Sequence, residues 1–222
     1  VIGTGLSLAM GVGCGVVLTS WFDCCPAGVS RPLWALGLAA AFLLALLVQI
    51  TLHEAGHLVC GLLSGYRFCS FRVGSLMWMR EDGGRLRLRR LRIAGTGGQC
   101  LMSPPEMAEG RLPVTLYNLG GPLANLLTAA LALAPRGPAE RGPLLSVFLL
   151  FFAVIGLFLA AMNGIPLRLG GIDNDGRNAL SLGRDPAALR AFWVQMKVAE
   201  AQARGLRLRE MPEDWFSMPG DE

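Results

Sequence analysis

The chain has 222 residues, of which 53% are hydrophobic and only 16% are charged, and its mean hydropathy is positive. This composition excludes an ordinary soluble domain, which carries more charge, and indicates an integral membrane protein. The formal net charge of +4 does not require a nucleic-acid partner, because arginines beside a membrane account for it.

Four stretches are long and apolar enough to cross a bilayer, which takes about 20 residues of helix. They lie at about 1–20, 34–65, 114–134 and 143–163. A signal peptide is the alternative for the first stretch, but it has neither a basic start nor a clear cleavage site before Cys24 and Cys25. The predicted fold class is therefore mainly α, a multi-pass membrane protein with about four transmembrane helices.

The distribution of basic residues predicts the orientation, because lysine and arginine near span ends favour the cytoplasm. With the N-terminus inside, the outer loops are residues 21–33 and 135–142. Their basic residues are Arg31, Arg136 and Arg141. The other 17 of the 20 basic residues then lie on the inner side, so we expect that side to face the cytoplasm.

The segment between the second and third spans alternates apolar and polar side chains, as strands do. Residues 67–80 run into the turn signal EDGG, and RLRLRRLRI returns, so we predict a β-hairpin with Asp82 and Gly83 in its turn. GTGGQCLM is expected to form a further extended segment. This hairpin or sheet region, residues 66–103, is predicted to lie at the cytoplasmic membrane surface.

The last part of the chain, residues 181–222, is more polar, and we expect a cytoplasmic helical tail after a membrane domain of residues 1–180. Asp185 followed by Pro186 predicts a helix start, because aspartate caps helices and proline suits their first position. Apolar residues recur at helical spacing until Gly205, a suitable stop. The result would be one amphipathic helix on the inner membrane face or against the hairpin.

The second predicted span contains the sequence HEAGH, an HExxH motif on a helix. His53 and His57 are four residues apart and face the same side, so both can bind one metal ion, and Glu54 lies beside it as a base for water. They are the only two histidines in the chain. A His-Glu-His network that bridges helices is the alternative, but bridging does not require this spacing, and ionisable residues in a span need partners.

A third metal ligand is expected, because catalytic zinc usually takes three protein ligands and one water. In apolar surroundings a carboxylate would balance the charge that two neutral imidazoles leave on the ion. The second and fourth spans end on the same side of the membrane, and Asp173 and Asp175 follow the end of the fourth. Either carboxylate fits this argument.

Three motifs together resemble the site-2 protease family of intramembrane zinc metalloproteases, of the bacterial type without a PDZ domain. They are HEAGH in one span, GGPLANLL at residues 120–127 in the next, and Asn163-x-x-Pro166 followed by Asp175-Gly176-Arg177. The motifs occur in the family's order, and the resemblance covers residues 34 to about 180. It places the chain in a bacterial inner membrane with its active site toward the cytoplasm.

The resemblance implies one zinc ion per chain, held by His53, His57 and Asp175, with Glu54 as the general base. The family's usual spacing from the motif asparagine to the ligand aspartate is shorter than the 12 residues from Asn163 to Asp175 here. An insertion after Pro166 would explain the difference, and it leaves Asp173 as an alternative ligand.

The resemblance also implies how a substrate is held. Asn163 matches an asparagine that holds the substrate backbone near the metal, and Asn125, in the GP-x-x-N helix, is the second predicted substrate-binding residue. The predicted hairpin resembles the family's membrane-associated β-sheet, which could take an unwound substrate segment as an extra strand. The expected partners are the lipid bilayer and a transmembrane protein substrate, with no nucleic acid and no prediction of oligomeric state.

The predicted function is zinc-dependent intramembrane endopeptidase, with Glu54 as the base for the water that attacks the peptide bond. The alternative from another class is a catalytically silent zinc-binding membrane scaffold or transporter component. The presence of Glu54 argues against it, since zinc binding needs only the ligands. A third possibility is a different membrane HExxH protease whose site is completed by a distant glutamate.

Overall fold

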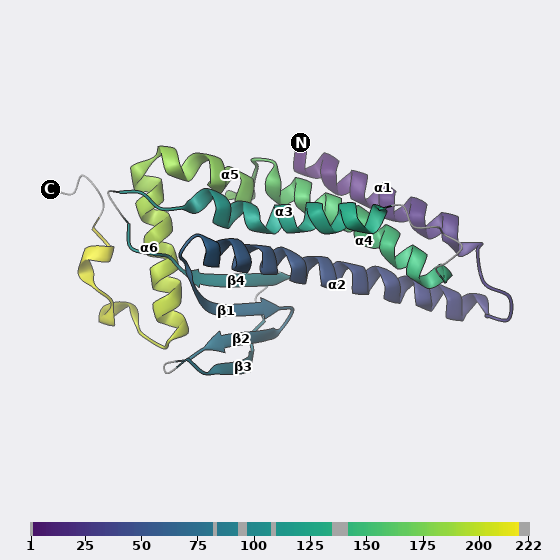
Figure 1. The fold of residues 1–222 in the computed structure, drawn as a ribbon, viewed down its shortest axis with the longest axis horizontal. Coiled ribbons are helices and arrows are strands. Elements are labelled where there is room, and N and C mark those ends of the chain that lie inside the picture. The colour runs from purple at the N-terminus through teal and green to yellow at the C-terminus, as the bar shows by residue number, and fades with distance from the viewer. Residues whose placement is uncertain (1, 82–83, 93–96, 108–109, 135–141, 218–222) are drawn as a thin grey trace.

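The computed structural model describes residues 2–81, 84–92, 97–107, 110–134 and 142–217, and it is mostly helical. Its four long helices are α1 (Ile2–Phe22), α2 (Arg31–Leu63), α3 (Val114–Leu133) and α4 (Pro143–Gly164), which lie side by side along the long axis (Figure 1). Each is long and apolar enough to cross a membrane, as the sequence predicted. The chain is therefore an integral membrane protein.

Helix α2 is longer than a membrane span requires. Its 33 residues extend about 50 Å at the rise of an α-helix, against a hydrocarbon core of about 30 Å. It begins at Arg31, before the predicted span, with Pro32 in its first turn, and it ends at Leu63 before Gly65, whose φ is +82°. The surplus length carries the end of α2 that contains HEAGH toward the polar part of the molecule.

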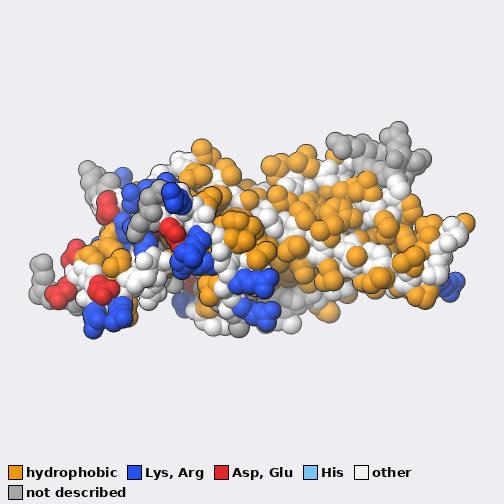
Figure 2. Space-filling model, turned by 90° about the horizontal axis from the view of Figure 1, so that it is seen from below, with side chains coloured by type: hydrophobic (Ala, Val, Ile, Leu, Met, Phe, Trp, Pro, Cys, Tyr) orange, Lys and Arg blue, Asp and Glu red, His pale blue; other side chains and the backbone are white. Residues whose placement is uncertain are grey.

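The long helices pack through an apolar cluster and leave their outer faces apolar. The buried members are Val17 from α1, Trp34, Leu38, Ala41 and Ala45 from α2, and Val147, Phe151, Phe152 and Ile155 from α4. Many leucines on the outside of these helices are exposed, which suits contact with lipid. Figure 2 shows hydrophobic side chains over this half and charged side chains gathered at the other end.

A four-stranded antiparallel sheet lies beside the HEAGH end of α2, with β4 nearest that helix (Figure 1). Its strands, in the order β3-β2-β1-β4, are β1 (Arg67–Val73), β2 (Leu76–Arg80), β3 (Leu86–Arg90) and β4 (Gly98–Ser103). The pairing of β2 with β3 across EDGG confirms the predicted hairpin, while Asp82 and Gly83 lie outside the described residues.

The segment that leads into EDGG, residues 67–80, contains two strands and a turn that the sequence pattern did not predict. The chain reverses at Gly74, whose φ of +57° is left-handed, and β1 and β2 pair with each other. The predicted extended segment GTGGQCLM contributes β4, but β4 pairs with β1 and forms the edge of the sheet. The alternation of side chains along this segment does not show that the chain turns between the two strands.

Helix α6 (Pro186–Ala203) starts and stops where the sequence predicted. The Asp185 carboxylate accepts hydrogen bonds from the N–H groups of Ala187 and Ala188 at 3.0 and 3.1 Å, and Gly205 follows the end with a φ of +90°. The helix packs against β4, so it lies against the sheet rather than alone.

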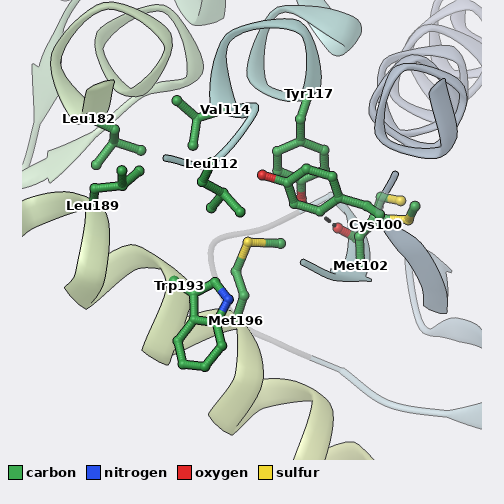
Figure 3. Packing of buried hydrophobic residues seen from close by; sticks show 10 residues of the cluster. Cys100, Met102, Leu112, Val114, Tyr117, Leu182, Leu189, Trp193 and Met196 are labelled. Carbon is green, nitrogen blue, oxygen red and sulfur yellow. Dashed lines mark hydrogen bonds between the residues drawn. The ribbon is translucent and has the colours of Figure 1, made fainter. Parts of the chain in front are cut away.

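A second hydrophobic cluster joins α6 to the sheet and to α3 (Figure 3). Its buried members are Tyr66, Cys100, Met102, Leu112, Val114, Tyr117, Leu182, Leu189, Trp193 and Met196. The indole N–H of Trp193 donates to the carbonyl oxygen of Pro105 at 3.0 Å. This hydrogen bond ties α6 to the segment between β4 and α3. This packing makes the first part of the tail integral to the fold, and the division at residue 180 stays a prediction.

The connection from α4 to α6 is compact. It contains a two-stranded hairpin, β5 (Arg168–Leu169) and β6 (Ile172–Asp173), followed by the short helix α5 (Asp175–Ser181). Gly170 and Gly171 make the hairpin turn with φ values of +58° and +87°. Short 3-10 turns complete the described tail at Leu182–Arg184, Leu208–Glu210 and Glu213–Trp215.

Candidate metal centre

Two glycines bring the backbones of α2 and α3 into direct contact. A Cβ atom at Gly56 would overlap the carbonyl oxygen of Gly120, and one at Gly120 would overlap the carbonyl oxygen of Gly56. Small residues permit this approach between membrane helices, where packing rather than water drives association. The contact places HEAGH of α2 directly against GGPLAN of α3, two motifs whose first residues are 67 positions apart in the chain (53 and 120).

Three side chains converge on one point at this contact. The Asp175 Oδ2 atom lies 3.3 Å from the Nε2 atoms of both His53 and His57, and the two Nε2 atoms are 3.1 Å apart. Bonds of about 2.0–2.1 Å to a tetrahedral zinc ion place neighbouring ligand atoms about 3.3 Å apart. The three atoms therefore have the spacing of one face of such a site.

The other ring nitrogen of each histidine has its own partner. Nδ1 of His53 lies 2.6 Å from Oδ1 of Asn125, and Nδ1 of His57 lies 2.9 Å from the carbonyl oxygen of Tyr117. Both partners are acceptors, so each Nδ1 carries the proton and each Nε2 presents its lone pair to the shared point. This is the arrangement that metal-binding histidines generally have.

Asp175 reaches the histidines because α5 is anchored to the end of α4. The Nδ2 group of Asn174 donates to the carbonyl oxygens of Met162 and Ile165, both at 2.6 Å. Its Oδ1 atom accepts from the N–H of Arg177 at 3.0 Å and so caps α5. Gly176 then packs on Gly164, where a Cβ atom would overlap the carbonyl oxygen. The glycine of the Asp-Gly pair is thus required by packing.

The structure distinguishes the two candidate aspartates. The Asp173 carboxylate forms ion pairs with Arg168 at 2.8 Å and Arg177 at 3.0 Å, whereas only Asp175 lies against the imidazoles. The β5–β6 hairpin accounts for the long spacing after Asn163, because it adds residues without moving α5 away from α4.

The environment of Asp175 favours the ionised carboxylate. Burial raises its pKa, but the interactions with the adjacent imidazoles of His53 and His57 outweigh burial and lower the pKa to about 2. Asp175 is therefore a negatively charged donor at neutral pH.

A glycine of α3 keeps the shared point open. A Cβ atom at Gly121 would lie 2.5 Å from Nε2 of His57 and 2.7 Å from Nε2 of His53, which is where a bound ion would sit. Two imidazole nitrogens, one carboxylate and a space that any larger residue would fill together fit a divalent metal. Among the described residues, His53, His57 and Asp175 are the group whose donor atoms could hold one.

The metal centre opens into a cleft of about 740 Å³. One wall is formed by Gly98–Leu101 of β4 and another by α6, whose cleft-facing residues include Ala188, Ala191 and Gln195. Glu54 lines the cleft and packs against β4, where a Cβ atom at Gly98 would lie 2.8 Å from Oε1 of Glu54.

The two asparagines predicted to bind substrate have different positions. Asn163 lines the cleft, and its amide donates to the Leu159 carbonyl oxygen at 3.0 Å. Asn125 is fully buried between α2 and α3, does not line the cleft and contacts His53 and Gln49. Its position corrects the expectation of a substrate contact, because a side chain with no exposed surface cannot reach a peptide.

Sequence reasoning did not identify three residues that shape this centre: Gln49, Tyr117 and Asn174. The sequence could have pointed to two of them. Gln49 is a glutamine inside an apolar span, where its amide needs hydrogen-bond partners. Asn174 is an asparagine just before a helix start, where asparagine commonly caps the helix. Tyr117 acts through its backbone carbonyl, so its side-chain identity carries no signal.

Comparison with known proteins agrees with this geometry. Residues 41–136 match the model of peptidase family M50, the site-2 protease family. This segment of the chain is therefore similar to family M50. No PDZ domain is detected in the chain. The matched segment contains HEAGH and GGPLAN and ends before Asn163 and Asp175, so the assignment of the third donor comes from the structure. No curated protein and no solved structure matches the chain.

The similarity to family M50 supports a membrane metalloprotease. The three clustered donors supply the metal-binding part of that description, and the four apolar helices supply the membrane part.

Proposed function

We propose that this chain is a zinc-dependent intramembrane endopeptidase that cleaves a transmembrane protein substrate. The observation that carries the proposal is the convergence of His53, His57 and Asp175 beside Glu54, at the bottom of a cleft that opens between β4 and α6. An HExxH pair alone would be a weak signal, but the carboxylate from α5 completes a three-donor site of the kind that catalytic zinc uses.

His53, His57 and Asp175 would hold one zinc ion, which when bound would acidify a water molecule and polarise the scissile carbonyl. The Glu54 carboxylate is placed to accept the proton of the attacking water and to return it to the leaving nitrogen. Its close approach to Gly98 of β4 supports a position on the cleft wall, within reach of a water at the metal. Asn163, which lines the same cleft, would hold the substrate backbone.

The walls of the cleft suit an extended peptide. β4 is the edge strand of the sheet and lines the cleft, so an unwound substrate segment can lie along it as an added strand. α6 faces it with alanines at positions 188, 191 and 199, which leave room for substrate side chains. Unwinding is needed because the peptide bonds of a helix are hydrogen-bonded and shielded.

We also propose that the metal centre faces the cytoplasm of a bacterial inner membrane. The support is the distribution of charge, since 16 of the 19 arginines fall in residues 67–111 and 168–209, the parts of the chain that contain the sheet, α5 and α6. Basic residues favour the cytoplasmic side of span ends.

The central test compares Glu54→Gln with the wild-type protein and with Glu81→Gln, a matched change at the exposed β2–β3 hairpin. Cleavage of a tagged single-span membrane substrate is measured in detergent micelles, and zinc is measured by mass spectrometry. Glu54→Gln should bind zinc normally and lose cleavage by about 100-fold or more, the usual contribution of a general base. Glu81→Gln should cleave like wild type.

Equal cleavage by Glu54→Gln and wild type would contradict the mechanism. Zinc binding by wild type with no proteolysis of any membrane substrate would instead favour a silent zinc-binding scaffold or transporter component.

A further inference from the structure

Gln49 is a polar residue with no exposed surface inside a membrane-spanning helix, one turn before His53. An amide in apolar surroundings costs several kcal/mol unless its hydrogen bonds are satisfied. Neither the metal donors nor the cleft includes Gln49, so its presence needs another explanation.

The side chain of Gln49 is held in one orientation by α4. Its Nε2 group donates to the carbonyl oxygen of Phe152 at 2.9 Å. Gly156 makes room for it, because a Cβ atom there would lie 2.5 Å from Nε2. With Nε2 directed at α4, the Oε1 atom faces α3 and is available as an acceptor.

Gln49 supplies two acceptors to Asn125. The Nδ2 group of Asn125 donates to the backbone oxygen of Gln49 at 2.9 Å and to its Oε1 atom at 2.7 Å. Both amide hydrogens are therefore used, and Oδ1 is left to accept from Nδ1 of His53 at 2.6 Å. A flipped Asn125 amide would set its oxygen against two other oxygens.

We propose that Gln49 is a positioning residue for the metal centre, which fixes the amide of Asn125 and through it the ring and tautomer of His53. The chain of contacts runs from Phe152 on α4 through Gln49 on α2 to Asn125 on α3 and back to His53 on α2. The inference rests on the proposed metal site, and it adds a residue that holds one ligand from a distance.

His57 provides an internal reference. Its Nδ1 partner is the backbone carbonyl oxygen of Tyr117, which is fixed by helix α3 and has no contact with Gln49. A change at Gln49 should therefore affect His53 and leave His57 as it is. The chain contains no other histidine, so the two rings account for every imidazole signal.

The experiment uses the full chain in detergent micelles and compares Gln49→Met, which keeps the length of the side chain, with Asn125→Leu and Thr51→Val. Thr51 is the matched control, because it lies between Gln49 and His53 in α2 and, within the described part of the chain, its hydroxyl donates to the Leu47 carbonyl oxygen at 2.8 Å and not to the network of Gln49. Zinc affinity is measured by competition with a fluorescent chelator. The imidazole nitrogens are observed by NMR of zinc-loaded protein labelled with ¹⁵N-histidine.

Gln49→Met should weaken zinc binding on the order of tenfold and shift the Nδ1 signal of His53 alone, and Asn125→Leu should do more, since outer partners of ligands contribute 10–100-fold. Thr51→Val should match wild type in both measurements. Should Gln49→Met not fold, Gly156→Ala displaces Nε2 of Gln49 from α4 and should give the same selective shift of His53.

Wild-type zinc affinity together with an unchanged His53 signal in Gln49→Met would overturn this inference. Equal shifts of both histidines, or an equal loss of affinity in Thr51→Val, would also overturn it, because they indicate general loosening. A wild-type protein that binds no zinc would refute the proposed function itself. None of these measurements depends on proteolysis.

Discussion

Polar groups at the α2–α3 contact and in the β2–β3 hairpin have opposite surroundings. At the contact, Asn125 and Gln49 are fully buried and hydrogen-bonded to each other. In the hairpin, Arg87 and Arg89 are exposed and both form ion pairs with the carboxylate of Glu81. Water cannot replace a lost partner at the contact, but it can at the hairpin. We therefore expect single-atom changes to have large effects in the first region and small effects in the second.

The largest expected effect is at the aspartates beside the contact. Asp175→Asn should lose zinc, because it removes the charged donor at 3.3 Å from both imidazoles, while Asp173→Asn should keep zinc and lose only the ion pairs to Arg168 and Arg177. Zinc content of the purified proteins measures this. Unchanged zinc in both variants would favour a site completed by a distant glutamate.

A single methyl group should have nearly as large an effect at Gly121. In Gly121→Ala the new Cβ atom would lie 2.5 Å from Nε2 of His57 and occupy the space for the ion, so zinc content should fall to background while the protein stays folded. Gly11→Ala in α1 is the matched control, since no atom lies within 4 Å of its Cβ position. Normal zinc content in Gly121→Ala would place the metal elsewhere.

The free energy of unfolding should also differ between the two regions, and one glycine in each region tests this. Gly56→Ala forces α2 away from Gly120 and should lower the free energy of unfolding by about 3 kcal/mol, the upper end for overpacking. In Gly84→Ala of the hairpin, the new Cβ atom would meet Arg80 only at an ordinary contact distance of 3.6 Å, but the φ of +81° remains, so the cost should be about 1 kcal/mol from backbone strain. Unfolding in mixed micelles measures both, and a reversed order would contradict the comparison.

The smallest effect should come from Glu81. Hydrogen bonds from Arg87 and Arg89 lower its pKa below the ordinary 4.5, so the stabilisation is present above that value and is lost as the pH falls through the lowered pKa. Glu81→Gln should be slightly less stable than wild type at pH 7 and equal to it at strongly acidic pH. A difference that persists in acid would mean that packing, not charge, is responsible.

The membrane helices, the hairpin across EDGG and the pair of histidines were all predictable, because each depends on residues close together in the chain. Hydropathy over about 20 residues predicts a span, and a four-residue spacing predicts that two imidazoles share a helix face. The start of α6 at Asp185 and Pro186 was predictable for the same reason, since a helix cap is local.

Tertiary structure alone decided the rest. Asp175 rather than Asp173 meets the histidines because Asn174 and Gly176 tie α5 to the end of α4, and no property of either aspartate reveals that. Asn125 faces His53 rather than the cleft because α3 approaches α2 closely at Gly56, a residue far from Asn125 in the sequence. Periodicity and capping act within a few residues, whereas these contacts join segments far apart in the chain, and only the packed helices bring them together.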